Sequence, residues 1–81
     1  MGYETVLEEI IKLARNQFPK EKPENIGENT TASDISSWNS LSHVMLIASI
    51  ENFFGIKFDL LQMVDMKSIG DIARATYQFL E

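Results

Sequence analysis

Apolar residues recur at helical spacing near both ends of the chain. The first set lies between early acidic and late basic residues and is followed by Pro19, which suits a helix that ends before the proline. This set comprises Leu7, Ile10, Ile11, Ala14 and Phe18. The second set begins at a capping box formed by Ser68 and Asp71. It comprises Ile69, Ile72, Ala73, Thr76, Phe79 and Leu80, and we predict a helix at each end.

A long polar stretch over residues 19–39 follows the first predicted helix. Its prolines and its glycine interrupt regular structure, and only a few isolated residues in it are apolar. Connections longer than about 12–15 residues are usually functional or disordered. We expect the second half of this one to be ordered, because three apolar residues can anchor it to the core. These anchors are Ile26, Ile35 and Trp38.

The segment 40–54 is predicted to form a helix that Asn39 caps and Gly55 ends. Most of its residues are apolar and Glu51 is its only charged residue, whereas an amphipathic surface helix carries a polar face. A domain of this size cannot enclose one helix on all sides. We therefore expect part of this helix to be a docking surface.

The remaining pattern completes an all-α fold. Asp59 and Gln62 predict a short capped helix around residues 60–64, and no run alternates with the period of a strand. We predict a single domain over residues 1–81, built as a small four-helix bundle of three main helices and one short helix with a long first loop.

Composition narrows the classes of function. Seven Lys and Arg against twelve Asp and Glu give a net charge of −5, which opposes binding to nucleic acid or to an anionic membrane surface. With no Cys and one His, thiolate or histidine metal sites and a cysteine nucleophile are not expected. The acidic first residues differ from a signal peptide, and no apolar run reaches the roughly 20 residues of a membrane span. We expect a cytoplasmic, monomeric protein that is not itself an enzyme.

Ser40 is the candidate modification site. It falls in the first turn of the helix predicted over residues 40–54, where free backbone N–H groups and the helix dipole favour a phosphate group. Between Pro23 and Ile56 there is no Lys or Arg, which fits a covalently attached phosphate better than one held by charge. The alternative is that Asn39 and Ser40 only cap the helix.

Around Ser40 the chain resembles the acyl carrier protein family, including the peptidyl carriers. The attachment motif of that family, Asp-Ser-Leu at the start of the second helix, stands here as Asn39-Ser40-Leu41. The resemblance continues through three segments, namely Trp38-Asn39-Ser40-Leu41-Ser42-His43, Glu51-Asn52-Phe53-Phe54-Gly55-Ile56-Lys57-Phe58 and Ser68-Ile69-Gly70-Asp71-Ile72-Ala73. The first helix and the long loop agree with the family in layout more than in motif.

This resemblance implies a 4′-phosphopantetheine arm on Ser40, added from coenzyme A by a phosphopantetheinyl transferase. The arm would carry an acyl or aminoacyl group as a thioester, so the thiol that the chain lacks would belong to the arm. An acyl-loading ligase or acyltransferase would charge the arm, and a downstream synthase or transferase would use the cargo. Fatty acid biosynthesis, and polyketide or other secondary metabolism, are the pathways in which such carriers act.

The resemblance also implies roles for residues of the second helix. The face presented to partner enzymes would comprise Asn39, Leu41, Val44, Met45, Ala48 and Glu51. The inward side, which would accept an acyl chain, would comprise Leu46, Ile50 and Phe54. Asn39 departs from the usual aspartate, since it keeps a capping oxygen but loses the charge that a basic transferase would meet. The helix is also poor in acidic residues, so docking is expected to be more apolar than is usual in the family.

Two other classes of function remain open. A non-catalytic helical adaptor would dock a partner through the apolar helix 40–54, with Ser40 acting only as a cap. An enzyme would need a turnover residue, such as His43 acting as a base. His43 lies one turn after Ser40, and we expect it either to be a half-exposed surface residue or to contact the phosphate of the arm.

Overall fold

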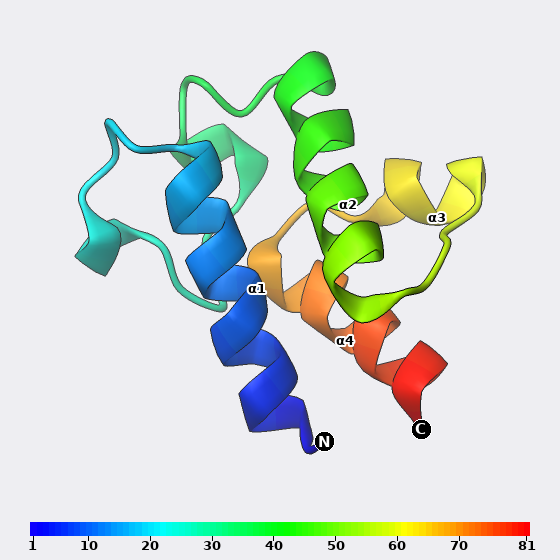
Figure 1. The fold of residues 1–81 in the computed structure, drawn as a ribbon. Coiled ribbons are helices and arrows are strands. Elements are labelled where there is room, and N and C mark those ends of the chain that lie inside the picture. The colour runs from blue at the N-terminus through cyan, green and yellow to red at the C-terminus, as the bar shows by residue number, and fades with distance from the viewer.

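The computed structural model describes residues 1–81 as four α-helices without a β-sheet (Figure 1). Their bounds are Tyr3–Gln17 for α1, Ser40–Phe54 for α2, Leu60–Asp65 for α3 and Ile69–Leu80 for α4. Two short 3-10 turns, Pro23–Asn25 and Ala32–Asp34, lie in the connection between α1 and α2. The predicted all-α fold of three main helices and one short helix, with a long first loop, is confirmed.

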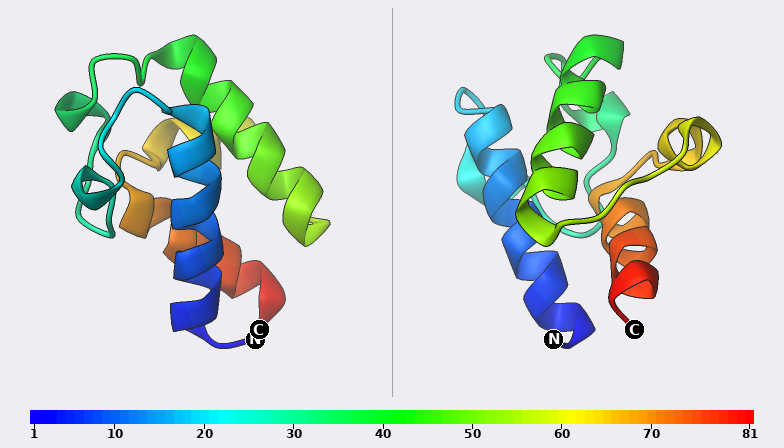
Figure 2. Two further views of the ribbon diagram at one scale, coloured as in Figure 1. Left: turned by 60° about the vertical axis from the view of Figure 1, so that its left-hand side comes forward. Right: turned by 45° about the vertical axis from the view of Figure 1, so that its right-hand side comes forward.

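The helix α1 is the centre of the bundle, because it packs against both α4 and α2 (Figure 2). The short helix α3 lies outside this packed group, on the far side of α2 from α1 (Figures 1 and 2). Both ends of the chain lie at the same end of the molecule. No helix is long and apolar enough to cross a membrane.

The core contains buried residues from each of the three main helices. Val6, Ile10 and Ala14 supply the face of α1, while Leu7 and Ile11 are only half-buried at its edge. The predicted face of α1 is therefore correct at Ile10, Ala14 and Phe18, while Val6 is a core residue that the prediction missed. From the other two main helices the buried apolar residues are Leu46, Ile47 and Ile50 in α2, and Ile69, Ile72 and Ala73 in α4.

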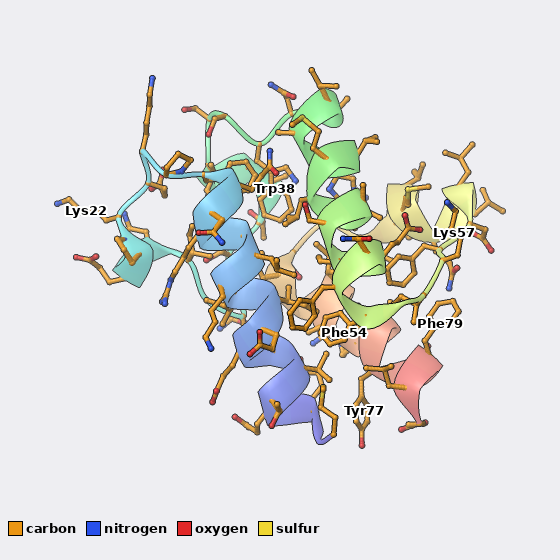
Figure 3. The ribbon with its side chains drawn as sticks, viewed as in Figure 1. Lys22, Trp38, Phe54, Lys57, Tyr77 and Phe79 are labelled. Carbon is orange, nitrogen blue, oxygen red and sulfur yellow. The ribbon has the colours of Figure 1, made fainter.

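The last turn of α4 differs from the prediction. Phe79 and Leu80 were expected in the core, but 45% and 37% of their surfaces are exposed. Next to α1 this turn presents Tyr77, whose ring meets Tyr3 edge-on with centroids 5.8 Å apart. Phe79 lies on the outer side of α4 and contacts Phe58 instead (Figure 3). The helical period alone does not reveal that the last turn of α4 extends beyond the core.

The connection between α1 and α2 is held to the core by the predicted anchors, since Ile26, Ile35 and Trp38 are all buried. Its first half is ordered as well, which the sequence did not predict. The Thr30 hydroxyl donates to the Asn25 carbonyl at 2.8 Å and accepts from the N–H of Gly27 at 2.9 Å. The Thr30 side chain thus satisfies backbone polar groups of this loop that no helix or strand pairs.

Backbone hydrogen bonds also tie this connection to the start of α4. Ile69 N–H donates to the Thr30 carbonyl at 2.9 Å, and Gly70 N–H donates to the Glu28 carbonyl at 2.8 Å. The Glu28 carboxylate accepts from the Tyr3 hydroxyl at 2.6 Å, which brings in α1. Burial and this hydrogen bond raise the pKa of Tyr3. The loop therefore closes one end of the bundle.

Replacing Gly70 by alanine should destabilise the protein. A Cβ atom there would lie 3.0 Å from the Glu28 carbonyl oxygen, so either the loop or α4 must move. We expect G70A to lose about 1–3 kcal/mol in urea unfolding, the usual range for overpacking. The matched control is G27A, whose Cβ would meet nothing within 4 Å. Equal stability of G70A and the wild type would contradict this close approach.

The stability of the protein should depend on the ionisation of Asp71. Its carboxylate accepts from Lys67 N–H at 3.1 Å and from the Arg74 guanidinium at 2.8 Å, and these bonds lower the pKa of Asp71. A lowered pKa in the folded state adds stability above the unfolded pKa of about 4, and this stability is lost as the pH falls through the folded value. Urea midpoints measured against pH should therefore show D71N below the wild type at pH 7 and approaching it at low pH. A gap that does not change with pH would contradict this role.

Candidate functional site

Ser40 is the first residue of α2, and its side chain is exposed. The cap of α2 is built by the two residues around it. Asn39 Oδ1 accepts from Ser42 N–H at 3.0 Å, and Ser42 Oγ accepts from Asn39 N–H at 2.8 Å. Ser40 takes no part in this capping box, and its hydroxyl has no hydrogen-bond partner within the chain. The alternative in which Ser40 serves as a cap is therefore wrong for its side chain.

The backbone around Ser40 is held in place although its hydroxyl is free. Ser42 Oγ donates to the Ser37 carbonyl at 2.7 Å, which joins the end of the connection to the first turn of α2. The N–H groups of Ser40 and Leu41 have no acceptor within the chain. A phosphate group on the Ser40 hydroxyl would lie beside these free donors and beside the positive end of the helix dipole.

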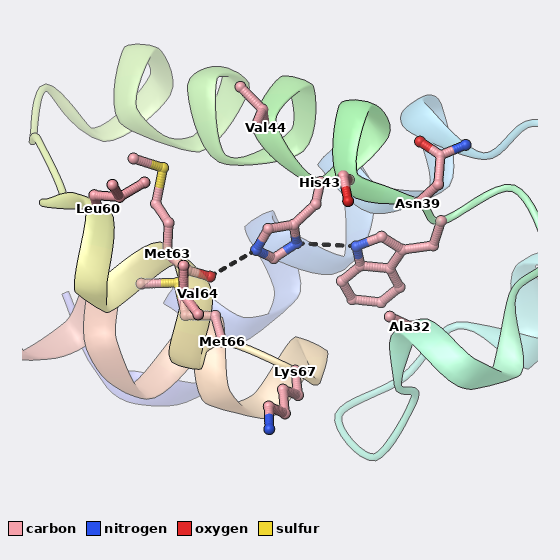
Figure 4. Close-up of a pocket in the computed structure, with 11 residues that line it drawn as sticks. Ala32, Asn39, His43, Val44, Leu60, Met63, Val64, Met66 and Lys67 are labelled. Atoms are coloured by element: carbon pink, nitrogen blue, oxygen red, sulfur yellow. Dashed lines mark hydrogen bonds between the residues drawn. The ribbon is translucent and has the colours of Figure 1, made fainter.

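Trp38 and His43 flank this turn and are joined by a hydrogen bond. The indole N–H of Trp38 donates to Nδ1 of His43 at 3.0 Å, and the two rings stack with centroids 6.0 Å apart (Figure 4). Nε2 of His43 lies 2.9 Å from the carbonyl oxygen of Met63 in α3. Because an indole N–H only donates, Nδ1 must be the acceptor, so Nε2 carries the proton and donates to Met63.

These bonds bear on the two expectations for His43 in the unmodified chain. The residue is half-buried, as the first expectation held. The second expectation, contact with the phosphate of an arm on Ser40, finds no support, because both ring nitrogens are already bonded to other partners. For the same reason the ring has no free lone pair with which to act as a base.

A pocket of about 710 Å³ opens beside Ser40, between the first turns of α2 and the helix α3 (Figure 4). Its lining is mainly apolar, which suits a non-polar group. One wall is formed by Ala32, Trp38, Asn39, Ser40, His43 and Val44. The other wall is formed by Leu60, Met63, Val64, Met66 and Lys67.

The second wall was not predicted from the sequence. Lys67 places a cation at the edge of this pocket, although the sequence between Pro23 and Ile56 contains no Lys or Arg. The signal in the sequence was the apolar composition of the short helix α3, which a six-residue helix in contact only with water would not need.

Most of the predicted partner face is exposed. Leu41, Val44 and Met45 have 71%, 56% and 50% of their surfaces accessible, and Ala48 is exposed too. The α3 helix extends this surface, because its exposed residues Leu60 and Val64 line the same pocket as Val44. We use the term apolar face for Leu41, Val44, Met45, Leu60 and Val64.

Glu51 does not belong with the rest of that predicted face. It is half-buried, and its carboxylate accepts from Phe58 N–H at 2.7 Å, which stabilises the turn between α2 and α3. The three residues predicted to accept an acyl chain lie in the interior: Leu46 and Ile50 are fully buried, and Phe54 packs against the core. None of the three lines the pocket beside Ser40. No group of three or more His, Asp or Glu side chains is placed to hold a metal ion.

Substitutions of Asn39 should separate the effect of its capping bond from the effect of a negative charge at the same position. N39A removes the acceptor of the Ser42 N–H and should cost about 1 kcal/mol of stability. N39D keeps this acceptor and adds a negative charge at the helix N-terminus, so it should be at least as stable as the wild type. Thermal unfolding of the three proteins measures the difference. Equal melting temperatures for N39A and the wild type would contradict the role of the cap.

Comparisons with known proteins identify no family for the chain. No protein-family model matches it, and no curated protein matches it either. The function of the chain must therefore be argued from its own residues and from the geometry around Ser40.

Proposed function

We propose that the chain is an acyl carrier protein that bears a 4′-phosphopantetheine arm on Ser40. The observation that carries this proposal is the exposed Ser40 hydroxyl, which makes no bond within the chain while its neighbours Asn39 and Ser42 cap the helix. A hydroxyl that the fold does not use, held at a helix N-terminus, is available to become a phosphodiester. When bound, the arm supplies a thiol on which an acyl or aminoacyl group is carried as a thioester.

The surroundings of Ser40 fit this group. The unpaired N–H groups of Ser40 and Leu41 favour the negative charge of a phosphodiester. The largely apolar pocket beside them offers space for the non-polar part of the arm or of its cargo. In this proposal Leu46, Ile50 and Phe54 form the neighbouring interior that a longer acyl chain would enter.

The apolar face suits enzymes that must reach Ser40. In this proposal a phosphopantetheinyl transferase, an acyl-loading ligase or acyltransferase, and a downstream synthase or transferase dock there in turn. Their contacts would be mainly apolar, because Glu51 is turned to the α2–α3 connection and the face carries no other acidic residue. The chain itself positions the cargo and performs no chemistry, which agrees with the engagement of both nitrogens of its one histidine.

A helical adaptor would use the same apolar face without using the Ser40 hydroxyl. The two functions therefore differ in one measurable property, the ability of Ser40 to accept the arm. The adaptor function gives no reason for a free hydroxyl at this position.

Intact-mass measurement tests the carrier function. The purified chain is incubated with coenzyme A, Mg²⁺ and a phosphopantetheinyl transferase of broad specificity, and we expect a gain of one phosphopantetheinyl group. S40A should gain no mass. The matched control S36A loses a different exposed hydroxyl near the site and should be modified like the wild type. An unmodified wild type would contradict the carrier function and favour the adaptor, while a modified S40A would contradict the assignment of the residue.

A further inference from the structure

The short helix α3 is joined to the rest of the molecule by a single hydrogen bond. Among residues 59–66, every other hydrogen bond is local to this segment, including the capping pair of Asp59 and Gln62. The exception is the bond from His43 Nε2 to the Met63 carbonyl, which spans twenty positions of the sequence. His43 is therefore the polar link between α2 and α3.

Within α3 only Met63 packs against the core, and it is half-buried. None of its six residues is fully buried, and Leu60, Leu61 and Val64 are each more than half exposed. The anchors are Phe58 before the helix and Met66 after it, which are 3% and 5% exposed. A helix of this length is not stable alone in water, so its position depends on the contacts at its ends and on the bond to its middle.

The bond from His43 satisfies the Met63 carbonyl, which has only a weak hydrogen bond within α3. Met63 lies in the last turn of α3, where carbonyl groups lack full intrahelical partners. Its carbonyl accepts a long 3.3 Å bond from Met66 N–H and the shorter 2.9 Å bond from His43. Trp38 orients the imidazole for this purpose, because its indole N–H occupies Nδ1 and leaves the proton on Nε2.

We propose that His43 is a positioning residue that holds α3 as the second wall of the pocket beside Ser40. The ring lines the pocket. Its bond with Trp38 fixes it within the wall that contains Ser40, and its bond to Met63 joins this wall to the other (Figure 4). The pocket is thus formed before any group occupies it. The consequence for an arm on Ser40 rests on the proposed carrier function, whereas the link to α3 is a property of the unmodified chain.

Two substitutions separate the bonds of His43. In H43Q the side-chain NH₂ takes the place of Nε2 and can donate to Met63, while in H43N the side-chain oxygen takes the place of Nδ1 and can accept from Trp38. Amide hydrogen exchange measured by NMR on the unmodified proteins should be about 3- to 10-fold faster in α3 for H43N, as expected for the loss of one hydrogen bond. H43Q keeps the Met63 bond but leaves the Trp38 N–H unpaired, so the exchange of all helices can rise with the loss of global stability. The ratio of α3 exchange to that of α1 and α4 in the same protein should therefore stay within about twofold of the wild-type ratio in H43Q, and should rise in H43N.

Each other outcome of this exchange experiment decides against the proposal. Unchanged exchange of α3 in H43N would show that the Met63 bond does not hold the helix. Equal acceleration in H43N and H43Q would show that the ring acts only by filling space. The tautomer gives a separate spectroscopic test, since ¹⁵N shifts of His43 should report a protonated Nε2 and an unprotonated Nδ1 in the wild type. The opposite tautomer would overturn the assignment of the donor.

The modified protein allows a direct test at the arm. Because the chain has no Cys, the thiol of the arm is the only thiol in the loaded protein, and its reaction with a soluble disulfide reagent can be followed without interference. If α3 shelters the arm, H43N should react about 3- to 10-fold faster than the wild type, in proportion to the opening of α3, and H43Q should react like the wild type. Equal rates in all three proteins would overturn the effect of His43 on the arm. Failure of the wild type to accept an arm would instead contradict the carrier function, and the exchange experiment then decides the role of His43 by itself.

Discussion

The buried indole N–H of Trp38 needs a hydrogen-bond acceptor, and the arrangement of the residues around Ser40 depends on the position of that acceptor. Trp38 is only 5% exposed and packs on Phe18, so an unpaired N–H would cost about 1–3 kcal/mol. Nδ1 of His43 accepts this bond, which leaves the proton on Nε2 and directs it to Met63. One buried donor thereby joins the long connection, α2 and α3. Ser40 lies between the two partners in sequence, so its backbone is fixed while its hydroxyl stays free.

Features that depend on neighbouring residues could be predicted from the sequence. A capping side chain bonds to a group three positions away, so Asn39, Asp59 and Ser68 mark the starts of their helices without any knowledge of the fold. An isolated apolar residue in a polar stretch has few uses other than burial, which is why Ile35 and Trp38 were identified as anchors. The exposed start of α2, and with it Ser40, followed from the same local signals.

Features that depend on how the helices are placed could not be predicted in this way. Lys67 reaches the pocket only because the connection before α4 is hydrogen-bonded to the loop at Ala32. Position 70 requires glycine because the Glu28 carbonyl oxygen, which is distant in the sequence, lies where a Cβ atom would be crowded. Phe79 satisfies the helical period but lies where no other helix covers it. The sequence analysis also missed one local contact, the capping box that Ser42 completes three positions after Asn39.

In the proposed function, the apolar face and the net charge would act on different steps of partner binding. The core takes up one side of α2, through Leu46 and Ile50, and leaves Leu41 and Val44 exposed on another. The carboxylate of Glu51, the only charge in α2, is turned away to Phe58 N–H, so the contact surface itself carries little charge. Burial of apolar area would then determine how long a partner stays, because most differences in affinity lie in the dissociation rate. The net charge of −5 would act at longer range, by raising the rate at which a basic partner arrives. Added salt should consequently slow association with such a partner more than it speeds dissociation.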